Sequence, residues 1–137
     1  MIRILLRLVA LIQLVLGLLY LFAPHWLLAR MGHSAPAPDL LYPLGMLAAR
    51  FIAYGLGLWV ASAAPARHRL WLRLMALIQL IDLGAGVAAT VSGTVSLALS
   101  AFPMFNAVWI AALCAVAGRE ETAAPRRPEA MAQPARG

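Results

Sequence analysis

Two opposite charges lie inside long apolar runs of this 137-residue sequence. Arg50 and Asp82 are each flanked mainly by aliphatic and aromatic residues. At the centre of a membrane-spanning helix such a charge costs roughly 2.5 to 3.5 kcal/mol on insertion scales, and it therefore pairs with another charge or lines a cavity. Pairing with the opposite charge would offset the free-energy cost of placing each of these two side chains in an apolar segment. We therefore predict an ion pair between Arg50 and Asp82.

Four further polar residues are expected to converge on this pair. Gln79 and Tyr54 lie three and four residues from the charge on their own segment, a spacing that puts each on the same helix face as that charge. The two remaining apolar segments each contribute one amide. The candidate intramembrane polar site comprises Arg50, Asp82, Gln79, Tyr54, Gln13 and Asn106.

The sequence leaves two interpretations of this site open. In the first, the polar groups satisfy one another and fix the register and depth of the helices. In the second, they face a small cavity, where Arg50 binds an anionic or quinone-type group and Asp82 relays a proton or orients Arg50. A predicted ion pair does not separate the two.

The composition predicts that the elements carrying these residues cross a membrane. The sequence is 64% hydrophobic and its mean hydropathy is +0.85, well above the usual range of soluble domains. Four apolar runs approach the roughly 20 residues needed to span a bilayer core. We predict an all-α polytopic membrane protein, a four-transmembrane-helix bundle over residues 1–118, with helices at about 4–22, 44–63, 70–90 and 95–117.

One eight-residue segment occurs twice. "RLVALIQL" begins at Arg7 and "RLMALIQL" at Arg73. The first copy continues to Leu16, whereas the second continues to Asp82 in the matching position. The repeat gives the first and third helices equivalent places and is compatible with two parallel helical hairpins, an arrangement known among membrane proteins. The second and fourth segments match poorly in sequence.

The arginines predict the orientation. All 11 basic residues are arginine, and all but Arg30 and Arg50 fall near the chain ends or the connection between the second and third helices. By the positive-inside rule both termini are cytoplasmic. In the first loop on the other side, we place Trp26, Leu27 and Leu28 in the headgroup layer. Residues 119–137 have the composition of a disordered cytoplasmic tail.

The sequence gives no direct support for an enzyme. It has no serine elbow, no glycine-rich phosphate loop and no CxxC motif, so we assign no catalytic residue. His25, His33 and Asp39 are too loosely spaced to predict a metal site. We predict no cofactor, with quinone kept as an alternative.

The net charge of +6 does not point to nucleic acid, because the arginines lie beside apolar spans and act as topology signals. The expected partners are the lipid bilayer and either a second copy of the chain or another membrane protein.

Several features together resemble the DoxX-like group of small bacterial membrane proteins. They are four short helices, a longer first outer loop, the segment "AARFIAYGLGLW" (48–59) and an acidic residue in the third helix. The resemblance covers most of residues 4–117. It implies a four-helix bundle in a bacterial inner membrane, in a group associated in places with membrane redox systems as accessory subunits.

These observations lead to three functional hypotheses. The first is an accessory or oligomerising inner-membrane subunit with a buried Arg–Asp pair. The alternatives are a minimal small-solute transporter, which needs a water-accessible path to the pair, and a redox subunit that docks quinone near Arg50, Tyr54 and Asp82.

Overall fold

The computed structural model describes residues 1–119, so the predicted tail, 120–137, lies outside the described residues. The described part is helical and contains no strand. It consists of α1 (Ile2–Phe22), α2 (Pro24–Arg30), η1 (Pro38–Leu40), α3 (Leu41–Ala63), η2 (Pro65–His68), α4 (Arg69–Val91) and α5 (Leu97–Ala117). The four long helices, α1, α3, α4 and α5, begin and end within three residues of the predicted bounds. All four long helices are long and apolar enough to cross a membrane.

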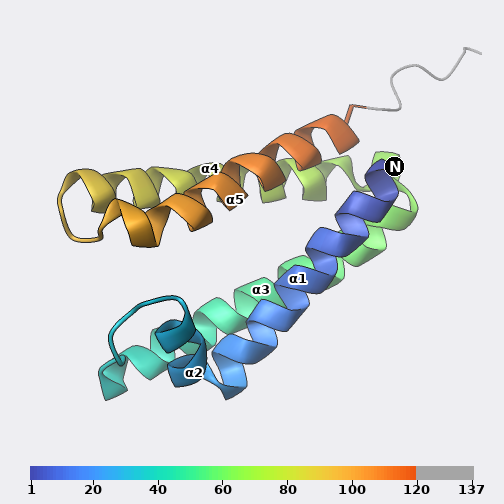
Figure 1. Ribbon diagram of the computed structural model, residues 1–137. Coiled ribbons are helices and arrows are strands. Elements are labelled where there is room, and N and C mark those ends of the chain that lie inside the picture. Colours follow the sequence, from blue (N-terminus) through green and yellow to red (C-terminus); the bar gives the residue numbers. More distant parts are fainter. Residues whose placement is uncertain (120–137) are drawn as a thin grey trace, which may run out of the picture.

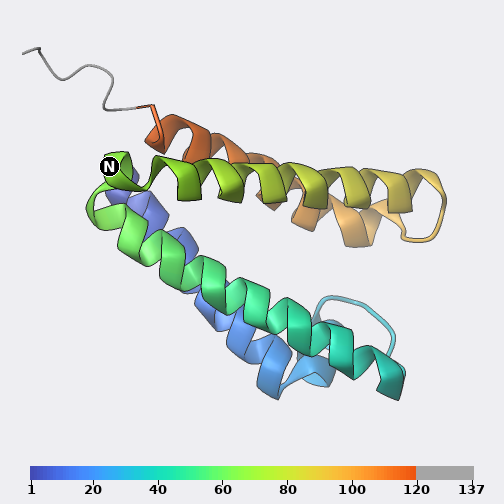
Figure 2. The same cartoon turned by 180° about the vertical axis from the view of Figure 1, so that it is seen from behind.

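The helices form two hairpins that meet at one end and diverge toward the other (Figure 1). α1 packs along α3, and α4 packs along α5, while the contacts between the hairpins are fewer and run between α1 and α5 and between α3 and α4. Figure 2 shows the same divergence from behind. We call the end that holds the start of α1 and η2 the closed end, and the end that holds α2 and the α4–α5 turn the open end.

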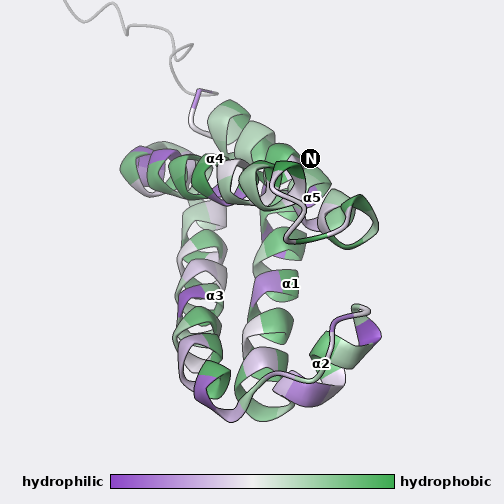
Figure 3. Cartoon of the chain, turned by 90° about the vertical axis from the view of Figure 1, so that its left-hand side faces the viewer, coloured by the Kyte–Doolittle hydropathy of each residue, from purple (hydrophilic) through white to green (hydrophobic). Residues whose placement is uncertain are grey.

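The hydrophobic core lies toward the closed end, where the hairpins meet. It takes residues from all four long helices, including Leu6, Leu58, Leu72 and Leu113. Most other large apolar side chains are exposed, and hydrophobic residues make up much of each long helix, interrupted by hydrophilic ones (Figure 3). Such a surface is expected where lipid is the solvent.

Small residues set the close packing of α1 on α3. A Cβ added to Gly17 would lie 3.1 Å from the Ala48 carbonyl oxygen, and one added to Gly55 would lie 2.8 Å from the Ala10 carbonyl oxygen. Glycines therefore bring the two backbones together from both sides, as is common between membrane helices.

Polar contacts accompany the packing at both ends of the hairpins. Near the closed end, the fully buried Ser62 donates a hydrogen bond to the Trp59 carbonyl (2.7 Å) and accepts one from Arg7 (3.3 Å). Near the open end of the other hairpin, the Thr90 and Ser100 hydroxyls lie 2.7 Å apart.

The repeat is visible in the burial pattern. Leu6, Val9 and Gln13 are buried on α1, and their counterparts Leu72, Met75 and Gln79, 66 positions later, are buried on α4. Equivalent positions of α3 and α5 are also buried, although the sequences of these two helices match poorly. The buried α3 residues Ala48, Gly55, Leu58, Ala61 and Ser62 correspond, 52 positions later, to Ser100, Ala107, Ile110, Leu113 and Cys114, which are buried on α5.

The helix contacts predict different effects for two glycines. Gly55→Ala places a Cβ 2.6 Å from the Leu14 side chain, and overpacking of this kind costs about 1 to 3 kcal/mol. Gly84 has open space around the same position, so Gly84→Ala is the matched control. Unfolding in mixed micelles should show a lower free energy of unfolding for Gly55→Ala only. Equal stability of the two variants would contradict the packing of α1 on α3.

Candidate functional site

The predicted ion pair is present and joins the two hairpins. The Arg50 guanidinium on α3 donates a hydrogen bond to the Asp82 carboxylate on α4. Arg50 lies nine residues from Leu41 and Asp82 nine residues from Val91, the residues at which their helices reach the open end. At 1.5 Å per residue both charges are roughly 14 Å deep along their helices. The equal depth allows a direct contact.

Tyr54, on the same helix as Arg50, contacts Arg50 and also Trp71 on α4. The Arg50 guanidinium carbon is 5.6 Å from the centre of the Tyr54 ring, within the range of cation–π attraction. The Tyr54 ring in turn meets Trp71 edge to face, with 6.4 Å between ring centres. Tyr54 therefore stabilises the position of Arg50.

A cavity of about 360 Å³ lies between the hairpins beside the ion pair. All five α-helices contribute to its wall. Five of the six predicted site residues line it, namely Gln13, Arg50, Gln79, Asp82 and Asn106, whereas Tyr54 does not. The structure thus brings most of the predicted polar residues into one space.

The ion pair is only partly enclosed. The side chains of Arg50 and Asp82 retain 38% and 36% of their exposed area. Here both charged groups remain accessible from the cavity that they line.

The two glutamines related by the repeat form the deeper part of the cavity. Gln13 and Gln79 are 2% and 6% exposed, and they lie slightly nearer the closed end than the ion pair does. The Oε1 atom of Gln13 is buried and has no hydrogen-bond partner among the described residues. Buried polar atoms are nearly always paired, so this oxygen marks a position where a donor is missing.

The apolar part of the wall was not predicted. Phe51 stacks on Tyr20, with 5.6 Å between ring centres, and both line the cavity together with Phe102 and Pro103. Tyr20 shares a helical stripe with Gln13, which is a usable sequence signal. For the phenylalanines the sequence offers none, because they resemble any lipid-facing residue.

Part of the first loop packs onto the cavity. Residues 24–30 form α2, and Leu27 is buried and lines the cavity with Met31, a contact that the sequence did not predict. The Tyr20 hydroxyl donates a weak bond to the Met31 sulfur at 3.9 Å. Trp26 is exposed, as expected.

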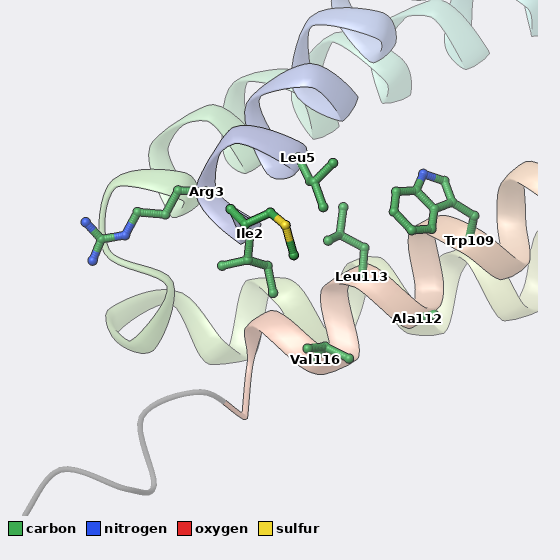
Figure 4. A pocket seen from close by; sticks show the side chains of 8 residues that line it. Ile2, Arg3, Leu5, Trp109, Ala112, Leu113 and Val116 are labelled. Carbon is green, nitrogen blue, oxygen red and sulfur yellow. The ribbon is translucent and has the colours of Figure 1, made fainter.

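A second hollow, of about 470 Å³, lies near the closed end between α1 and α5 (Figure 4). Leu5 and Leu113 face each other across it, and Trp109 flanks them. Its one charged lining residue, Arg3, points away from the hollow. The hollow offers apolar surface and no convergent polar groups, so the cavity beside the ion pair is the better candidate for chemistry.

Residues 1–119 contain no group of three or more His, Cys, Asp or Glu side chains placed to hold a metal ion. The polar groups of the cavity are donors and acceptors for binding. The fold is that of a small membrane protein with four long apolar helices, and polar side chains line the cavity between its hairpins. No protein-family model, no curated protein and no solved structure matches the chain.

Removing one charge should destabilise the protein. Asp82→Asn leaves Arg50 without its counter-ion, and we expect a loss of about 1 to 3 kcal/mol, less than for a fully buried pair because both side chains are partly exposed. Unfolding in mixed micelles measures this loss. The double exchange Arg50→Asp with Asp82→Arg should recover most of it. An unchanged free energy of unfolding in Asp82→Asn would show that the pair does not join the hairpins.

Proposed function

We propose that the protein binds an amphipathic small molecule dissolved in the membrane, as a binding subunit rather than as an enzyme. The polar head of the molecule occupies the space beside Arg50 and Asp82. Its apolar part lies against Phe51, Phe102 and Leu47. The observation that carries this proposal is the cavity into which five of the six predicted polar residues converge.

The composition of the wall supports a ligand of mixed character. Binding sites for small molecules are mostly apolar, with a few polar groups that fix orientation. This cavity has that composition, since its aromatic and aliphatic side chains outnumber its polar ones. Its volume also falls within the usual range of ligand pockets, about 300 to 1,000 Å³.

The partial exposure of the ion pair favours a binding site over a purely structural pair. Both charged side chains here remain more than a third exposed. These groups retain the capacity to bond with a further molecule.

The core at the closed end argues against transport through one copy of the chain. A transporter requires a path from the site to both sides of the membrane. The contacts among Leu6, Leu58 and Leu72 fill the junction between the site and the closed end. The site is therefore better suited to holding a molecule than to passing it through.

This proposal accommodates quinone-type molecules, which combine a polar ring with an apolar tail. We also propose kinship with the DoxX-like group, which would give such a ligand a context in membrane redox systems. We propose on the same basis an inner-membrane location and an association with a second copy or another membrane protein, to which the ligand would pass.

Filling the cavity tests the proposal. Leu47 lines the cavity, whereas the adjacent Met46 is exposed on the outside of α3. With the full chain in lipid nanodiscs, radiolabelled 4-nonylphenol should bind saturably above the level of empty nanodiscs of the same lipid. Leu47→Trp should weaken this binding about tenfold, equivalent to about 1.4 kcal/mol, while Met46→Trp should leave it unchanged.

Two results would contradict the proposal. One is the absence of saturable binding to the unmodified protein. The other is equal binding by Leu47→Trp and Met46→Trp, provided that both variants unfold at the denaturant concentration of the unmodified protein.

A further inference from the structure

We infer that the hollow near the closed end, between α1 and α5, binds an anionic phospholipid. One acyl chain of the lipid lies in the hollow, and its phosphate head group lies against Arg3. This site is separate from the cavity beside the ion pair, so the inference does not rest on the proposed function.

The wall of the hollow suits a hydrocarbon chain. Seven of its eight lining residues are apolar, and they come from the beginning of the chain and from α5. Leu5 and Leu113 face each other across the hollow (Figure 4). Trp109 and Val116 in its wall are 40% and 52% exposed, so the hollow is open to the surrounding lipid. An acyl chain covers such a wall without leaving a polar group unpaired.

The depth of the hollow matches one leaflet of the membrane. Trp109, its deepest lining residue on α5, lies eight residues from Ala117, at which α5 reaches the closed end. At 1.5 Å per residue this depth is about 12 Å. The hydrocarbon core of a bilayer is about 30 Å thick, and each leaflet takes half of it. The hollow therefore fits a lipid chain of the closed-end leaflet, whereas a membrane-spanning helix of a second copy would need a groove of about 30 Å.

Arg3 places a cation at the rim of the hollow. It is one of the lining residues, but its side chain extends away from the hollow (Figure 4). The residue is exposed and has no hydrogen-bond or ion-pair partner within residues 1–119. Long basic side chains near the ends of membrane helices reach out to the head-group layer. The Arg3 guanidinium is therefore available to the phosphate of a lipid whose chain lies in the hollow.

The charges around the hollow favour an anionic lipid over a zwitterionic one. Arg67, Arg69 and Arg73 also lie toward the closed end, in η2 and the first turns of α4. The two acidic residues within 1–119 lie elsewhere, since Asp39 belongs to η1 at the open end and Asp82 lines the cavity. Basic pockets between membrane helices bind anionic lipid head groups. Phosphatidylglycerol, which has a net negative charge, is therefore expected to bind more tightly than phosphatidylcholine, which has none.

Quenching of Trp109 fluorescence tests the inference on the full chain in lipid nanodiscs. Phosphatidylglycerol or phosphatidylcholine with brominated acyl chains replaces increasing shares of a phosphatidylcholine host, and bromine quenches tryptophan fluorescence on contact. Subtracting the signal of Trp109→Phe separates Trp109 from the other three tryptophans. We expect phosphatidylglycerol to bind beside Trp109 about fivefold more tightly than phosphatidylcholine, the effect of one arginine near the membrane surface.

Two results of this comparison would overturn the inference. Equal quenching by the two lipids would show that the closed end does not select an anionic head group. Absence of quenching by either lipid would show that another part of the protein, or a second copy, covers the hollow.

A pair of arginine variants separates Arg3 from the general charge of the closed end. Arg67 is also exposed at this end but does not line the hollow. Arg3→Gln should reduce the preference for phosphatidylglycerol to about twofold or less, whereas Arg67→Gln, which removes the same charge, should leave it near fivefold. Equal losses in the two variants would indicate attraction by surface charge alone and would overturn the inference.

A pair of alanine variants tests whether the acyl chain lies in the hollow. Ala112 and Ala115 are both exposed on α5, and only Ala112 lines the hollow. Ala112→Phe should lower the quenched fraction of Trp109 fluorescence by about half or more, because the added ring takes the place of the chain, while Ala115→Phe should not change it. Equal quenching in the two variants would place the chain outside the hollow and overturn the inference. Neither substitution alters a buried residue, and the comparison of the two lipids requires neither of them.

Discussion

The contact between Arg50 and Asp82 is the interaction on which the arrangement of the two hairpins depends. Toward the closed end the hairpins are held by apolar packing, but they diverge toward the open end. Across this divergence the ion pair is the one side-chain hydrogen bond between the hairpins that the described residues form. In an apolar medium neither charge has a comparable partner, so the pair sets how far apart the hairpins lie at that depth.

The same divergence creates the cavity. If the hairpins packed along their whole length, Gln13, Gln79 and Asn106 would meet one another in a closed core. Because the hairpins separate, these amides face an open volume of about 360 Å³ that α2 and the aromatic rings partly cover. The shape that exposes the ion pair is thus also the shape that leaves room for a ligand, which is why we interpret the pair as part of a binding site.

The sequence predicted those parts of the structure that depend on the length and periodicity of apolar segments and on the free-energy cost of an unpaired charge in a bilayer. Apolar length gave the four spans, and the cost of unpaired charges in a bilayer gave the pair Arg50–Asp82. The repeat anticipated the equivalent burial of Gln13 and Gln79. Residues 120–137 lie outside this comparison, and the orientation in the membrane remains a prediction.

The rest depends on the angle between the hairpins, which periodicity does not determine. Helical spacing places a residue on a face, but the tilt of one hairpin against the other decides which faces meet. That tilt brings Phe51 and Phe102 to the cavity and leaves Tyr54 outside it. It also gives Leu27 a buried position that the composition of the first loop does not reveal.

The measurement that tests the binding site most directly is protection of a cysteine in its wall. Asn106→Cys, in a Cys114→Ala background, places a thiol in the cavity, and Ser92→Cys places one in the exposed α4–α5 turn as a control. N-ethylmaleimide should label both thiols in nanodiscs, and saturating 4-nonylphenol should slow labelling at position 106 only. Labelling at position 106 that the phenol leaves unchanged, in a folded variant, would contradict a ligand site between the hairpins.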